Sequence, residues 1–133
     1  MKLLTYAMLG MLAMQPLIAT PALALQKIAT VYQEVSSFSS KPISAATLEK
    51  AFKTCSSARG WRFARVAPGK LIGQLTVRSK HYVKIEVEYN SNAYKISYLD
   101  STNMRYDAKT NTIHKRYNSW MTNLSDDVKF CLQ

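Results

Sequence analysis

The chain contains two histidines, His81 and His114, whose imidazoles are the side chains best suited to acid–base chemistry near neutral pH. Two histidines beside a cationic residue can in principle cleave a phosphodiester, if each ring reaches the proton that it moves. His81 lies two positions before Val83 in a predicted strand, however, so both side chains point to the inner face of the sheet. This favours a place for His81 in the core or at a sheet end. Nothing in the spacing brings the two rings together. A small hydrolase that uses His114 is therefore kept as a third interpretation of the function, after the two binding functions given at the end of this subsection. The sequence predicts no enzyme and no catalytic residue.

A polar cluster is expected around His114. His114 and Asn118 are four residues apart, so they share one face of a helix. Ser101, Asn103 and Tyr106 come shortly before that helix and can fold against its first turn. Such a cluster could bind a small polar or anionic group, helped by free N–H groups at the helix start. The favoured alternative is structural: His114 and Asn118 hydrogen-bond carbonyl groups of the preceding loop and hold it in place.

A second candidate surface is the exposed side of the predicted sheet, which carries Arg78, Tyr82, Lys84 and Lys95. Tyr82 could stack on a sugar or a base between its basic neighbours. The signature of an RNA-recognition domain is missing, so no nucleic-acid partner is predicted. The motifs of phosphate-binding loops, serine hydrolases and zinc proteases are missing too, and the sequence predicts no cofactor and no metal.

The formal net charge of +10 at pH 7 favours encounter with anionic partners such as a lipid headgroup, an anionic glycan or an acidic protein. The basic residues are spread along the chain, and Lys115–Arg116 is the only adjacent pair. No block of five like charges occurs. A dispersed basic surface that aids solubility is therefore favoured over a dedicated anion site, which remains the alternative.

Residues 1–24 have the layout of a secretory signal peptide. Met1 and Lys2 give a positive start, residues 3–13 are mostly apolar, and an Ala-Leu-Ala triplet ends at Ala24, after which we expect cleavage. The alternative is an uncleaved membrane anchor, because about 20 apolar residues span a bilayer, but a glutamine and two prolines interrupt the second half. Cleavage would remove one charge, leave a formal charge of +9, and allow no stable membrane insertion.

Export would allow the only two cysteines, Cys55 and Cys131, to oxidise. Each cysteine lies on the apolar stripe of a predicted helix, so the sulfurs can meet where the two helices touch. The sequence therefore predicts a disulfide, with two buried free thiols as the alternative. Two cysteines this far apart, without a CxxC motif, match no zinc site.

Residues 25–43 are expected to be a lead-in to a single domain over 44–133. The apolar residues Ile28, Val31, Tyr32 and Val35 recur at the spacing of a short amphipathic helix. A serine-rich stretch that ends at Pro42 follows, and it is typical of a linker.

The domain pattern predicts an α+β fold with four strands between two helices. Ser44 is a good N-cap for a helix over 45–58, and Gly60 ends it. Apolar residues that step by three and four predict a last helix over 113–132. The order α-β-β-β-β-α places both helices on one face, because an antiparallel meander with one apolar face needs a cover. The strands are expected over 61–67, 70–79, 81–89 and 93–99.

Several short motifs carry a resemblance to a known family. They are Arg59-Gly60-Trp61, Pro68-Gly69, Ser101-x-Asn103-Met104-x-Tyr106 and Ile113-His114-x-x-Tyr117-Asn118-x-Trp120-x-x-x-Leu124. Over residues 48–132 the chain resembles a family of small, functionally uncharacterised periplasmic proteins and lipoproteins of Gram-negative bacteria. The resemblance implies a periplasmic or secreted protein of this architecture and no activity. The chain departs from the family in having no lipid-attachment cysteine after the signal peptide, and the cysteine pair is not part of the pattern.

Taken together, these features predict an exported envelope protein that acts as a non-enzymatic binding or accessory domain. Its partner would be an envelope protein or an anionic ligand, held at the exposed sheet face or at the cluster around His114. The alternative is a secreted basic binder or inhibitor of an acidic partner, such as an anionic glycan, a lipid headgroup or an acidic enzyme.

Overall fold

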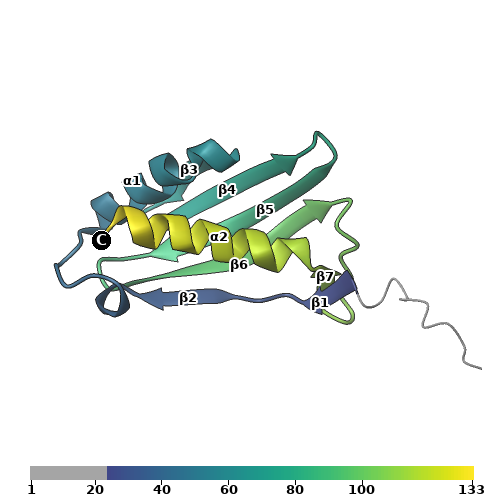
Figure 1. Cartoon of the computed structure of the whole chain (residues 1–133), viewed down its shortest axis with the longest axis horizontal. Helices are drawn as coiled ribbons and strands as arrows, with labels where there is room; N and C mark the ends of the chain where they lie inside the picture. Colours follow the sequence, from purple (N-terminus) through teal and green to yellow (C-terminus); the bar gives the residue numbers. More distant parts are fainter. Residues whose placement is uncertain (1–23) are drawn as a thin grey trace, which may run out of the picture.

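The computed structural model describes residues 24–133 of the chain. The predicted signal peptide therefore lies outside the described residues, apart from its last position, Ala24. Within the described part, no helix is both long enough and apolar enough to cross a membrane. The structure is an α+β arrangement in which two helices lie over an antiparallel sheet (Figure 1). The elements are β1 (Leu25–Lys27), β2 (Val31–Glu34), α1 (Ala45–Cys55), β3 (Arg62–Ala67), β4 (Lys70–Val77), β5 (His81–Tyr89), β6 (Ala93–Thr102), β7 (Thr112–His114) and α2 (Arg116–Cys131).

The main sheet has five antiparallel strands in the order β2-β6-β5-β4-β3, and β1 pairs with β7 in a small second sheet. Strands β3 to β6 form the predicted meander. The expectation of four strands was wrong by one, because β2 adds to the edge beside β6, with Val31 opposite Ile96 and Glu34 opposite Ala93. The apolar residues Ile28, Val31, Tyr32 and Val35 fit a helix by spacing alone, but pairing with the open edge of β6 makes Val31–Glu34 a strand, and Val35 begins a short 3-10 helix, Val35–Ser37.

Three element boundaries differ from the predictions by three residues each, and others differ by one or two. The last helix begins at Arg116 rather than at 113, because Ile113 pairs with Gln26 in the β1–β7 ladder. The first helix ends at Cys55, and a short 3-10 helix, Ser57–Arg59, continues it to Gly60. Strand β6 runs to Thr102, because a bulge next to Leu99 lets pairing with β5 continue beyond the predicted end.

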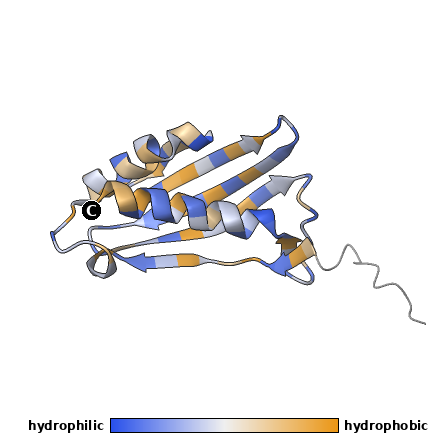
Figure 2. Cartoon of the chain, in the orientation of Figure 1, coloured by the Kyte–Doolittle hydropathy of each residue, from blue (hydrophilic) through white to orange (hydrophobic). Residues whose placement is uncertain are grey.

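Both helices pack on the same face of the main sheet, as predicted (Figure 1). Ser44 caps α1, since its hydroxyl oxygen accepts a hydrogen bond from the Thr47 N–H at 3.1 Å. Hydropathy alternates along β4 and β5 (Figure 2), and buried residues of these strands alternate with exposed or half-buried ones. The fully buried side chains that join the two layers include Leu48 and Phe52 of α1, Leu71, Ile85, Val87 and Tyr94 of the sheet, and Tyr117, Leu124 and Val128 of α2.

The predicted disulfide between Cys55 and Cys131 is present. It joins the last residue of α1 to the last residue of α2, with 6.3 Å between the two Cα atoms. A second link between the same two regions is the ion pair of Arg59 with Asp127. The ends of the two helices are therefore tied together covalently and electrostatically above the sheet.

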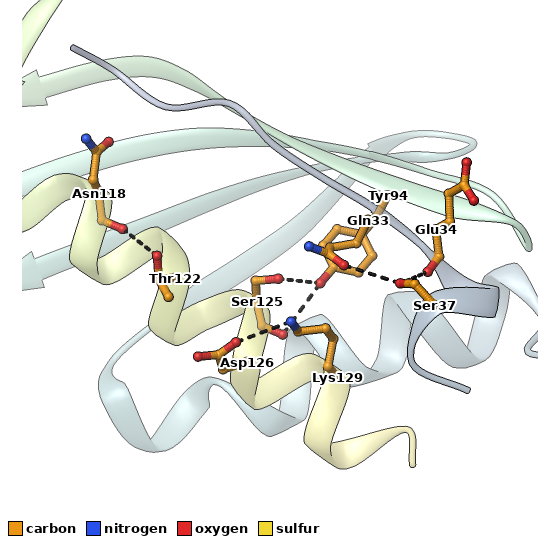
Figure 3. A network of polar contacts seen from close by, with 9 residues as sticks. All are labelled: Gln33, Glu34, Ser37, Tyr94, Asn118, Thr122, Ser125, Asp126 and Lys129. Atoms are coloured by element: carbon orange, nitrogen blue, oxygen red, sulfur yellow. Dashed lines mark hydrogen bonds and ion pairs between the residues drawn. The ribbon is translucent and has the colours of Figure 1, made fainter. Parts of the chain in front are cut away.

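A buried polar contact fixes α2 to the sheet. The Tyr94 hydroxyl lies 2.5 Å from the Ser125 hydroxyl, and both side chains are almost completely buried (Figure 3). Burial raises the pKa of Tyr94 to about 12, so the phenol stays protonated at neutral pH. Tyr117, on the same helix, is fully buried as well, but its hydroxyl has no hydrogen-bond partner among the described residues.

This difference predicts opposite effects of one substitution at two tyrosines. Tyr117→Phe is expected to leave the free energy of unfolding unchanged or to raise it by about 1–3 kcal/mol, because an unpaired buried hydroxyl opposes folding. Tyr94→Phe is expected to lower it by about 1 kcal/mol, because Ser125 loses its partner. Urea unfolding of both variants measures these changes. Equal losses at the two positions would show that the Tyr117 hydroxyl has a partner.

Candidate anion-binding site

The structure brings His81 and His114 to one small cavity, although their spacing in the sequence did not indicate it. The cavity has a volume of about 60 Å³ and is lined by His81, Met104, His114, Arg116 and Trp120. His81 begins β5 and His114 ends β7, so the two rings come from different sheets. The chain after β6 connects them, because the Met104 carbonyl accepts a hydrogen bond from the His114 N–H at 2.8 Å.

The ring of His81 is held by the loop that follows β6. Its Nδ1 lies 2.9 Å from the carbonyl oxygen of Asn103, so in the neutral ring Nδ1 carries the proton and Nε2 has the lone pair. The Asn103 side chain donates in turn to the Lys80 carbonyl at 2.8 Å. Asn103 has a left-handed backbone with φ of 59°, a conformation that asparagine tolerates better than most residues. Asn103 is therefore a positioning residue for His81.

The ring of His114 is held in the opposite way. Its Nδ1 accepts the backbone N–H of Arg116 at 3.2 Å, so the proton of the neutral ring sits on Nε2. Burial lowers the pKa of His114 below its ordinary value, and Arg116, His81, Lys115 and Arg105 lower it further. Every charged neighbour that contributes to this shift is a cation. The cavity therefore lies in a positive field, which an anion bound beside His114 would relieve.

The polar cluster predicted around His114 is divided in the structure. Asn118 faces the N-terminal segment: its Oδ1 accepts the Ala29 N–H at 3.0 Å, and its Nδ2 donates to the Lys27 carbonyl at 2.9 Å. Asn118 therefore has the expected structural role, but it holds the chain between β1 and β2 rather than the loop before α2. The Ser101 hydroxyl lies 2.7 Å from that of Tyr98.

Tyr106 also lies away from the cavity, because its ring packs against Tyr98 with 4.4 Å between the ring centroids. Of the five predicted residues, His114 lines the cavity, and Asn103 acts on it through His81. The other three stabilise neighbouring parts of the chain.

The predicted sheet-face residues lie on the side that the helices leave uncovered, apart from Arg78, which stands in the turn after β4 with φ of 55°. Basic residues on this face have acidic neighbours across the strands. Lys84 is opposite Asp100, and Lys95 is opposite Glu88. A further pair, Lys70 and Glu86, is in contact at 2.8 Å. Positive charge on the sheet face is therefore locally balanced, in contrast to the cavity of the two histidines.

Arg116 and Trp120 were not among the predicted site residues. They are four positions apart on α2, so they lie on one face of its first two turns. Their spacing is readable in the sequence, but Trp120 continues the apolar stripe of the predicted last helix, which favours a place in the core. In the structure it is half-buried and forms part of the cavity wall.

Comparison of the chain with protein-family models, with curated proteins and with solved structures finds no match. The resemblance to small periplasmic proteins stays a prediction that rests on the motifs quoted above.

Proposed function

We propose that the protein is an exported, non-enzymatic binding domain that holds an anionic group of an envelope ligand or partner in the cavity formed by His81, His114 and Arg116. The observation that carries this proposal is a hollow lined by two imidazoles and a guanidinium, with Lys115 and Arg105 as further cations that act on His114. The disulfide supports placement in an oxidising compartment such as the periplasm of a Gram-negative bacterium.

The start of α2 adds to the attraction for an anion. This helix has 16 residues and begins at Arg116, beside the cavity. Among residues 24–133, the N-cap residue Lys115 makes no side-chain cap, and Nδ1 of His114 accepts the N–H of Arg116, so further N–H groups of the first turn remain able to donate. The positive end of the helix dipole favours the same sign of ligand. A phosphate or carboxylate would meet donors from the Arg116 side chain and from Nε2 of His114.

Binding of inorganic phosphate to the chain after signal-peptide removal tests the proposal. In NMR spectra, phosphate is expected to shift the ring protons of both histidines and to raise the pKa of His114, because the anion stabilises the protonated ring. Affinity should therefore increase as the pH falls below about 6.5, the range in which His114, whose pKa is lowered in the free protein, takes up a proton. Two unchanged histidine titrations in the presence of phosphate would contradict the proposal.

A matched pair of variants separates the cavity from the net charge. Arg116→Gln and Lys41→Gln each remove one positive charge, but Lys41 lies in the serine-rich segment and lines a different surface hollow. Arg116→Gln is expected to weaken phosphate binding about 10- to 100-fold, as for the loss of a charged hydrogen bond. Lys41→Gln should leave it nearly unchanged. Equal weakening in both variants would mean that phosphate senses only the overall charge.

One observation favours a second candidate, a hydrolase. Nε2 of the neutral His81 ring has its lone pair free and can accept a proton, whereas Nε2–H of His114 could donate one when that ring is protonated. A neutral general base beside a protonated general acid is the pair that phosphodiester cleavage needs. Release of nitrophenolate from bis(4-nitrophenyl) phosphate tests it: turnover that His81→Gln and His114→Gln each abolish, in folded protein, would replace the binding proposal with an enzymatic one.

A further inference from the structure

A larger hollow lies directly beside the cavity of the two histidines. It has a volume of about 300 Å³ and is lined by Arg59, Trp61, Leu75, Val77, Trp120 and Asn123. Trp120 belongs to the walls of both hollows. Val77 of the larger hollow is paired across the β4–β5 turn with His81 of the smaller one. The two hollows are therefore neighbours on the helix-covered side of the sheet.

Helix α2 forms one continuous wall along both hollows. Arg116, Trp120 and Asn123 are spaced by four and three residues, so they follow one face of the helix over two turns. The opposite wall is the end of β4 and the start of β5, with Leu75, Val77 and His81. A ligand lying between these walls would meet cationic groups at one end and apolar groups at the other.

The larger hollow, which we name the tryptophan groove, is largely uncharged. Its one arginine, Arg59, is paired with Asp127, whose carboxylate contacts both Nε and a terminal guanidinium nitrogen. Trp61, which lines the groove, is buried and stacks on Phe63 with 5.7 Å between the ring centroids. A volume of about 300 Å³ with aromatic walls is at the small end of the range for small-molecule sites.

We propose that the cavity and the tryptophan groove form one site for a small amphiphilic phosphate monoester. The phosphate would lie between His81, His114 and Arg116, and its aryl or short alkyl group would lie along Trp120, Leu75 and Val77. This inference rests on the proposed function for the anionic end and adds the apolar part of the ligand. The uncharged groove beside a cationic cavity favours this class over inorganic anions alone.

Calorimetric titrations of the folded, oxidised chain with inorganic phosphate, phenyl phosphate, hexyl phosphate and phenol test the inference. Both esters are expected to bind about tenfold or more tightly than phosphate, because their apolar groups leave water. The ester with the higher affinity shows whether the groove prefers the aryl group of phenyl phosphate or the alkyl group of hexyl phosphate. The only two tryptophans of the chain, Trp61 and Trp120, line the groove, so the esters should change tryptophan fluorescence more than phosphate does.

Two variants of β4 provide a matched comparison. Val77→Gln places a polar side chain in the tryptophan groove and should remove the advantage of the esters while leaving phosphate affinity unchanged. Thr76→Gln, on the uncovered face of the same strand, should change neither.

Each outcome has a defined meaning. Phosphate that binds as tightly as both esters would overturn the amphiphile inference and leave the proposed function standing. No binding by any phosphate would overturn both. If phenol binds as tightly as phenyl phosphate, the tryptophan groove binds its ligand without help from the cavity. This result would also contradict a single site formed by the cavity and the groove.

Discussion

Replacing Cys55 and Cys131 together by serine is expected to lower the free energy of unfolding by about 4 kcal/mol. The disulfide closes a loop between residues 76 positions apart, and such a loop restricts the unfolded chain strongly. In a domain with about 5–15 kcal/mol of total stability, this loss would lower the melting temperature by roughly 15–30 °C. Thermal unfolding followed by circular dichroism measures it.

Reduction of the unmodified protein provides the control for this prediction. The reduced protein and the double serine variant should unfold at nearly the same temperature, because both lack the cross-link. The double replacement is used because a single serine variant would leave one thiol free to form dimers. A variant as stable as the oxidised protein would show that the link adds little beyond the packing of α1 against α2.

Phe52→Ala is expected to lower the free energy of unfolding by about 3–5 kcal/mol. Phe52 is fully buried where α1 meets the sheet. Its ring contacts Tyr94 edge-on with 5.1 Å between centroids, and Phe63 with 5.6 Å. Removing it leaves a cavity between the two layers in addition to the lost apolar burial. Equilibrium unfolding in urea measures the change.

The chain offers the same substitution at an exposed site as a control. Phe130 is 81% exposed, so Phe130→Ala should change stability by less than about 0.5 kcal/mol. If Phe52→Ala prevents folding altogether, Phe52→Leu keeps most of the volume and should still lose more than Phe130→Ala. Similar small effects at positions 52 and 130 would contradict a core formed by both helices on one sheet face.

The two proposals for function depend on the same core. The disulfide and Phe52 fix α1 and α2 against the sheet, and the groove wall of α2 stands opposite the end of β4. Variants for ligand binding should therefore be compared only when their unfolding midpoints match that of the parent protein. Such a comparison separates a lost contact with the ligand from a displaced helix.

Local patterns in the sequence were sufficient to predict both helices, the four strands of the meander and the disulfide. Ser44 and Gly60 act on their immediate neighbours, and alternation along 81–89 follows from the geometry of a single strand. The cysteine pair followed from two helical stripes and one shared sheet face. Each of these inferences needs only the period of one element and a need to bury one face.

Tertiary structure decided the features that join distant parts of the chain. Val31 fits a helical period, yet pairing with Ile96 makes it a strand residue. Ile113 continues the stripe of α2, yet pairing with Gln26 places it in β7. The two histidines line one cavity because the segment after β6 returns past the start of β5 before it enters β7. Periodicity describes how a segment presents its own side chains, whereas partners far apart in sequence are chosen by packing and by the hydrogen bonds of open strand edges.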